Sequence, residues 1–99
     1  MKREYFNRYT SEILSMFRLT KQDLFVKNKK RDVVDARNLL YFVCSNRQMR
    51  LVTIQEYMAE EGYKISHTSI IHGIKRVQEQ IVSDKDYLTS IKRIESCIS

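Results

Sequence analysis

The chain contains no proline, no tryptophan and only two glycines among its 99 residues. Tight β-hairpin turns usually require glycine, asparagine or aspartate, and proline and glycine are the strongest breakers of helices. The scarcity of breakers therefore favours a mostly helical chain. A length of 99 residues is typical of one small domain, so we expect a single domain spanning residues 1–99.

Cysteine is scarce, and long apolar runs are absent. Cys44 and Cys97 form no Cys-x-x-Cys pair, so the sequence predicts neither a disulfide framework nor a zinc site of that kind. No apolar run approaches the roughly 20 residues that span a bilayer, and the start of the chain has no apolar segment typical of a secretory signal. We expect an intracellular protein with no membrane association, in which Cys44 is a buried thiol within LLYFVC.

Positive charge is in excess, with 18 Lys and Arg residues against 12 Asp and Glu residues and a net charge of +6. Four of the five residues in KNKKR, residues 27–31, are basic. A surface of this sign attracts nucleic acid, an anionic membrane or an acidic protein. A charge run that only keeps a loop solvated is the alternative.

Apolar periodicity predicts about six helices. A first helix is expected from about Glu4 to Arg18, with an apolar stripe of Tyr5, Tyr9, Ile13, Met16 and Phe17. A short second helix follows Thr20, which forms a capping-box pattern with Asp23. Residues 27–31 then form a loop, and a strongly apolar third helix begins after Asp32 as its cap. It carries Val33, Ala36, Leu39, Leu40, Val43 and Cys44.

The second half of the chain has the order of a helix-turn-helix. TIQE, residues 53–56, has the pattern of a capping box with Thr53 as the cap, and that helix should end near Gly62. Ser66 can cap a longer fifth helix, and Asp84 can cap a sixth. In a helix-turn-helix, the second helix places its N-terminal side chains in the major groove of DNA.

The fifth helix is expected to have two opposite faces. Its expected apolar face consists of Ile70, Ile71, Ile74, Val77 and Ile81, and a mainly polar face of Thr68, Ser69, His72, Arg76 and Glu79 lies opposite, with Lys75 at the margin. Hydroxyl groups bind base edges or phosphates, and cations bind the DNA backbone. Free amides in the first helical turn also favour a phosphate.

Three other interpretations of this stretch are a metal site, a nucleophile pair and a simple helix cap. A metal site is disfavoured because His67 and His72 diverge by about 140° around a helix and have no further ligand in register. A Ser69–His72 nucleophile pair has no acidic residue to orient the imidazole and no glycine-rich turn for an oxyanion hole. In the third interpretation, Ser66 is only a helix cap. We expect no catalytic site, no metal and no cofactor.

The stretch SHTSIIHGIKRV, residues 66–77, resembles the signature of the C-terminal DNA-binding domain of the bacterial replication initiator DnaA. Upstream, LTKQDLFVKNKKRDVVDARNLLYFV is similar to that family's short helix, basic loop and long buried helix, and TIQEYM is similar to the start of its next helix. The resemblance covers nearly the whole chain. It implies an all-α fold with a helix-turn-helix of the DnaA domain IV or Trp repressor-like type.

The resemblance also implies roles for individual residues. Basic-loop residues such as Lys29, Lys30 and Arg31 would enter the minor groove or contact the backbone, and Arg37 would hold a phosphate. His67 and Thr68 would read bases, while Ser69 and His72 would contact phosphates or base edges. The full set expected to contact DNA is Lys27, Lys29, Lys30, Arg31, Arg37, Thr53, Lys64, Ser66, His67, Thr68, Ser69, His72, Lys75 and Arg76.

The chain departs from the family in ways that bear on function. Ser66 stands where the family has an acidic residue, so an acceptor for a cytosine or adenine amino group is lost. No GxxxxGK[ST] sequence occurs, so the initiator's ATPase domain is absent. We expect a stand-alone protein, cytoplasmic in a bacterial or phage-infected cell, that binds double-stranded DNA in replication or transcription control. The alternatives are a module that engages a host initiator or an acidic partner, and an RNA- or single-strand-binding protein.

Overall fold

The computed structural model describes residues 2–98, and within this range it contains six α-helices and no β-strand. The helices are α1 (Lys2–Phe17), α2 (Lys21–Phe25), α3 (Arg31–Asn46), α4 (Leu51–Glu60), α5 (His67–Ser83) and α6 (Lys85–Glu95). The expectation of an all-α fold with about six helices is confirmed. The all-α fold was predictable from the sequence because few residues interrupt the helical patterns.

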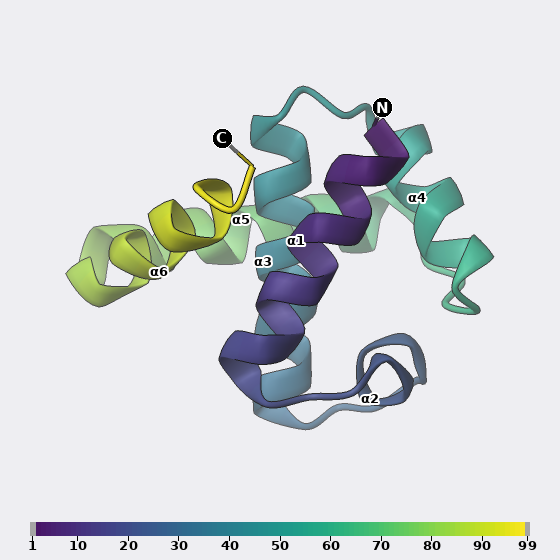
Figure 1. Cartoon of the computed structure of the whole chain (residues 1–99), viewed down its shortest axis with the longest axis horizontal. Coiled ribbons are helices and arrows are strands. Elements are labelled where there is room, and N and C mark those ends of the chain that lie inside the picture. The colour runs from purple at the N-terminus through teal and green to yellow at the C-terminus, as the bar shows by residue number, and fades with distance from the viewer. Residues whose placement is uncertain (1, 99) are drawn as a thin grey trace.

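Helix α3 lies at the centre and contacts each of the other five helices. Its most extensive contacts are with α1 and α5 (Figure 1). Helix α4 lies on one side of this centre, and the end of α5 and all of α6 extend on the other side (Figure 1). The start of α5 is therefore the part of that helix closest to α4 and to the turn that joins them.

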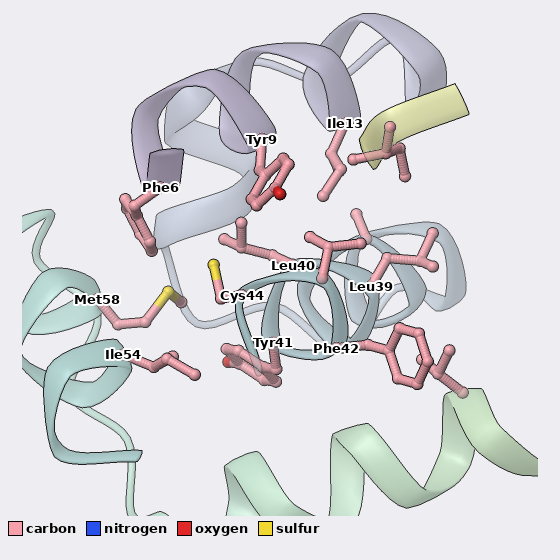
Figure 2. Close-up of a cluster of buried hydrophobic side chains, with 14 of the residues drawn as sticks. Phe6, Tyr9, Ile13, Leu39, Leu40, Tyr41, Phe42, Cys44, Ile54 and Met58 are labelled. Atoms are coloured by element: carbon pink, nitrogen blue, oxygen red, sulfur yellow. The ribbon is translucent and has the colours of Figure 1, made fainter. Parts of the chain in front are cut away.

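The core is built around α3 because that helix is apolar over most of its circumference. All six residues from Leu39 to Cys44 are buried. Figure 2 shows α1 contributing Phe6, Tyr9 and Ile13 on one side of α3, with Ile54 and Met58 of α4 on another. Cys44 is a free, fully buried thiol, as expected, and burial raises its pKa.

Three helix caps and one turn residue form as predicted. The Thr20 hydroxyl accepts a hydrogen bond from the Asp23 amide, and the Asp23 carboxylate accepts one from the Thr20 amide. Ser66 caps α5, and Asp84 caps α6. Gly62 follows α4 with a φ of +99°, a conformation that glycine adopts without the steric strain of a Cβ atom.

Two other predicted caps are wrong. Helix α4 begins at Leu51, so Thr53 is an interior residue of the helix and no TIQE capping box forms. The Ile54 amide donates to the Arg50 carbonyl at 3.0 Å, which closes a first turn that already contains Thr53. Helix α3 likewise begins at Arg31 after Lys30, and the Asp32 carboxylate binds its neighbour's amide. These helices start earlier because their first turns close without a side-chain cap.

The buried face of α5 is also rotated from the predicted one. Ile70 and Val77 are buried, but Ile71 is 37% exposed and Ile74 is half-buried. Gly73 lies at the centre of the buried face, where a Cβ atom would stand 2.6 Å from Asn38 Oδ1 and 2.9 Å from Tyr41 Cδ2. Helices α3 and α5 therefore pack closely at Gly73, which has no side chain to separate them. This packing places Gly73 on the buried face of α5 and leaves Ile71 facing outward.

The two terminal helices show smaller differences. In α1, Tyr9 and Ile13 of the predicted stripe are buried, but Phe6 is buried in place of Tyr5, which is only half-buried. The apolar pattern of α6 predicts Tyr87, Leu88, Ile91 and Ile94 on one side of the helix; Ile91 and Ile94 are buried, but Leu88 is 39% exposed. The basic residues of the last turn of α6 lie where the helix dipole favours them.

Tyr87→Phe should remove part of the protein's instability in alkali. Burial, with Asp35 and Asp84 nearby, raises the pKa of Tyr87 from its usual 10.0 to about 12. The unfolded chain therefore loses this proton first, so the stability contributed by Tyr87 is intact below pH 10 and is lost as the pH rises towards 12. The buried Tyr87 hydroxyl has no hydrogen-bond partner among the described residues, so phenylalanine leaves no group unpaired.

The measurement is a urea unfolding series between pH 8 and pH 11.5 for the parent and the variant. We expect the stability advantage of Tyr87→Phe to grow above about pH 10. A constant difference between the two proteins across the series would contradict the raised pKa.

Candidate nucleic-acid interface

The basic segment between α2 and α3 is shorter than predicted. Arg31 is the first residue of α3, so the loop that contains KNKKR ends at Lys30. The Arg31 Nε atom lies 3.8 Å from Asp35 Oδ2 on the same helix. The Asn28 side chain accepts a hydrogen bond from the Lys30 amide at 2.8 Å and forms a tight local turn. Lys27, Lys29 and Lys30 are exposed, so their ammonium groups are free to meet an anion.

Arg37 has a different position from the other basic residues, because it is only 4% exposed. Its guanidinium donates hydrogen bonds to the carbonyls of Leu24, Val26 and Asn28, at 2.7, 2.5 and 2.9 Å. Its Cζ atom lies 4.4 Å from the centre of the Tyr63 ring, which is a cation–π distance. The observed contacts of Arg37 therefore hold the backbone before α3, and the phosphate contact implied by the resemblance stays a prediction.

The head of α5 presents small polar groups. Ser66 Oγ accepts a hydrogen bond from the Ser69 amide at 3.2 Å and lies 3.1 Å from the Ser69 hydroxyl. His67 and Thr68 are exposed, and their side chains make no hydrogen bond within residues 2–98. Before the helix, the Gln55 side chain donates to the Ile65 carbonyl at 2.7 Å and attaches the turn to α4.

A cleft of about 430 Å³ brings the basic loop and the head of α5 together. It is lined by Lys27, Asn28, Lys29, Val34, Arg37, Asn38, Tyr41, Tyr63, Lys64, Ile65, Ser66 and Ser69. A second hollow shares three of these residues, Val34, Asn38 and Ser69, and continues between α3 and α5 past His72, Gly73 and Arg76. Among the described residues, the exposed cations Lys27, Lys29, Lys64 and Arg76 and the buried Arg37 line this path and no Asp or Glu does, so the lining favours an anion.

The structure gathers part of the predicted set and leaves the rest outside the cleft. Lys27, Lys29, Arg37, Lys64, Ser66, Ser69, His72 and Arg76 line the two connected hollows. The exposed residues His67, Thr68 and Lys75 lie on the same helix without lining them. Lys30 is the N-cap of α3, Arg31 begins that helix, and Thr53 is a half-buried residue inside α4, so these three are not brought to the cleft.

Sequence reasoning missed Asn38 and Tyr63. Asn38 lines both hollows, and as the polar residue directly before the apolar run from Leu39 to Cys44 it was an available signal. Tyr63 lines the cleft and carries the Arg37 contact, but nothing in GYKI indicates that its ring meets an arginine 26 positions earlier.

The described residues form no cluster typical of a metal site, since within residues 2–98 no three or more His, Cys, Asp and Glu side chains are grouped as metal ligands. Over the same range, no helix combines the length and the apolar character needed to cross a bilayer. No known protein-family profile matches the chain, and no solved structure is recognisably similar to it.

Proposed function

We propose that this protein binds double-stranded DNA, with the head of α5 in the major groove and the basic loop on the backbone or in the minor groove. The observation that carries the proposal is the cleft, in which cations from two distant segments converge without an acidic residue. Cations on one face are the electrostatic footprint of a DNA-binding domain, since they neutralise phosphates and release counterions.

The order of elements supports the same proposal. Helix α4, a turn with Gly62 at positive φ, and the longer helix α5 follow one another as in a helix-turn-helix. His67 and Thr68 are exposed in the first turn of α5, where a recognition helix contacts base edges. Beyond them, His72, Lys75 and Arg76 are exposed along the same helix and would reach the backbone. The proposed biological role is replication or transcription control, by a DnaA-like domain.

Thr68→Ala should weaken binding to a selected duplex by about 1 to 3 kcal/mol and change binding to random duplex little. Base contacts provide specificity, whereas phosphate contacts only position the protein. Because Thr68 is exposed, its stability should change by no more than about 0.5 kcal/mol. Paired titrations on a duplex selected from a random library and on random duplex measure the effect, with Thr89→Ala on α6 as the matched control.

Two results would oppose the proposal in different ways. If the parent binds no duplex at low salt, the protein is not a DNA-binding protein. If Thr68→Ala and His67→Ala both bind the selected duplex as the parent does, the head of α5 is only a helix cap.

A second candidate function is a protein-interaction module. Val82 is 88% exposed and Leu88 is 39% exposed near the junction of α5 and α6, at the end of α5 opposite its proposed base-reading head. DNA binding at the head of α5 makes no use of these apolar side chains. Duplex binding that is lost when Lys27, Lys29 and Lys64 of the cleft are replaced by alanine, but is unchanged in Val82→Ser, would favour DNA binding over this second candidate.

A further inference from the structure

We propose that Arg37 is a positioning residue, which sets the distance between the basic loop and the head of α5 and so allows both to engage one duplex. The inference rests on the proposed function, and it gives Arg37 a task other than direct contact with DNA. Its basis is the buried Arg37 guanidinium, which donates hydrogen bonds to the carbonyls of every second residue from Leu24 to Asn28 and also contacts the turn before α5.

The basic loop has few other anchors. Leu24 and Phe25 are buried at the end of α2, but Val26 is 51% exposed and the lysines that follow are exposed. Within residues 27–29, the only hydrogen bonds are made by Asn28: its side chain bonds the Lys30 amide nearby, and its carbonyl accepts from Arg37. The bond to Arg37 is thus the one that joins residues 27–29 to another element.

The guanidinium also meets the segment that leads into α5, through the Tyr63 ring. The Tyr63 ring lies 4.4 Å from Arg37 Cζ, and the Tyr63 amide donates to the Met58 carbonyl at 2.9 Å, which attaches this turn to α4. Arg37 is therefore in contact with the basic loop and with the helix-turn-helix at once. A change in its position would move Lys27 and Lys29 relative to Ser66 and Ser69 across the cleft.

The shape of the guanidinium is needed as well as its charge. Arg37 has no carboxylate within 4.0 Å among the described residues, so carbonyl dipoles and the Tyr63 ring compensate its buried charge. A planar guanidinium offers five N–H groups in a fixed fork, and three of them are used here in three directions. A lysine ammonium is a compact charge and cannot reach the three carbonyls while it stacks on the ring.

The test compares Arg37→Lys, which keeps the net charge, with Arg93→Lys, an exposed arginine on α6 as the matched control. Native-state trypsin cleavage after Lys27, Lys29 and Lys30, followed by mass spectrometry, reports how firmly the loop is held. We expect cleavage there to accelerate at least about tenfold in Arg37→Lys, because a released loop opens locally. A thermal melt of each variant verifies that the protein is folded.

The second measurement is the dependence of duplex affinity on salt. The log–log slope should become shallower by about 1.8 in Arg37→Lys, since Lys27 and Lys29 lose phosphate contacts worth about 0.9 each. Neither quantity should change in Arg93→Lys. Parent-like loop cleavage or a parent-like slope in folded Arg37→Lys overturns the inference, because a purely structural role would leave the slope of the folded protein unaltered.

Two further outcomes keep the test decisive. If Arg37→Lys does not fold, Tyr63→Leu removes the ring contact alone and should still raise loop cleavage and flatten the slope, and parent-like values in that variant overturn the inference. If the parent itself binds no duplex, the proposed function is wrong, and the cleavage rates alone decide whether Arg37 holds the loop.

Discussion

Ile70→Ala should lower the free energy of unfolding by about 2 to 5 kcal/mol, whereas Ile71→Ala should lower it by less than about 1 kcal/mol. The two residues are neighbours and both substitutions remove the same atoms, but Ile70 is fully buried and Ile71 is 37% exposed. Alanine at position 70 leaves a cavity under α5, in a core that packs like a crystal and relaxes only in part.

Urea unfolding of the two variants measures this difference. Affinity for DNA should fall in Ile70→Ala only through the unfolded fraction, because its side chain faces the core. Equal losses of stability in the two variants would show that the buried face of α5 is not centred on Ile70, Gly73 and Val77. In that case the exposed positions proposed to read DNA would also have to be reassigned.

Replacing Lys27, Lys29 and Lys64 together by alanine should nearly abolish duplex binding at moderate salt. These residues line one cleft, although they come from segments more than 30 positions apart. If each neutralises one phosphate, the log–log salt slope should become shallower by about 2.7, and affinity at 0.1 M salt should fall by about 100- to 1,000-fold. Stability should change little, because all three side chains are exposed.

The matched control is a triple alanine variant of Lys85, Lys92 and Arg93, which are exposed on α6 away from the cleft. Both triple variants lower the net charge by three, from +6 to +3. If the slopes of the two variants fall equally, the net charge drives binding and the cleft is not the interface. A loss confined to the cleft variant supports a defined site.

Local signals in the sequence were enough for the helices and several of their ends. Few glycines and no proline left the apolar periodicities uninterrupted, so the six helices could be located from pattern alone. The caps at Thr20, Ser66 and Asp84 form because each hydroxyl or carboxylate reaches an amide two or three residues away, which is a local interaction. Gly62 was identified by its tolerance of positive φ.

Capping patterns failed where the start of a helix is decided elsewhere. Thr53 and Glu56 match a capping box, yet α4 begins at Leu51, next to the buried Met49. Packing of Met49 and Leu51 against the core favours helix before the cap candidate is reached. Tertiary contacts of this kind override a local preference worth about 1 kcal/mol.

The sequence predicts which residues belong to the candidate site but not the cleft that several of them line. The exposed positions on α5 follow from its period, because Thr68 and His72 lie opposite the buried Ile70 and Val77. Ser69 and Arg76 are exposed beside the buried face, where they line the hollow between α3 and α5. The rotation of the buried face of α5 that exposes Ile71 could not be predicted from the sequence. It depends on how closely α5 approaches Asn38 and Tyr41 of α3 at Gly73.

The sequence by itself determined the helical class, the main cap positions and the polar head of α5, because each depends on residues within a few positions of one another. Only the tertiary structure decided that the basic loop and that head line one cleft, that Arg37 is buried beside them, and that Lys64 joins Lys27 and Lys29 there. These arrangements join segments tens of residues apart, and they arise because α3 and α5 bury their apolar faces against each other.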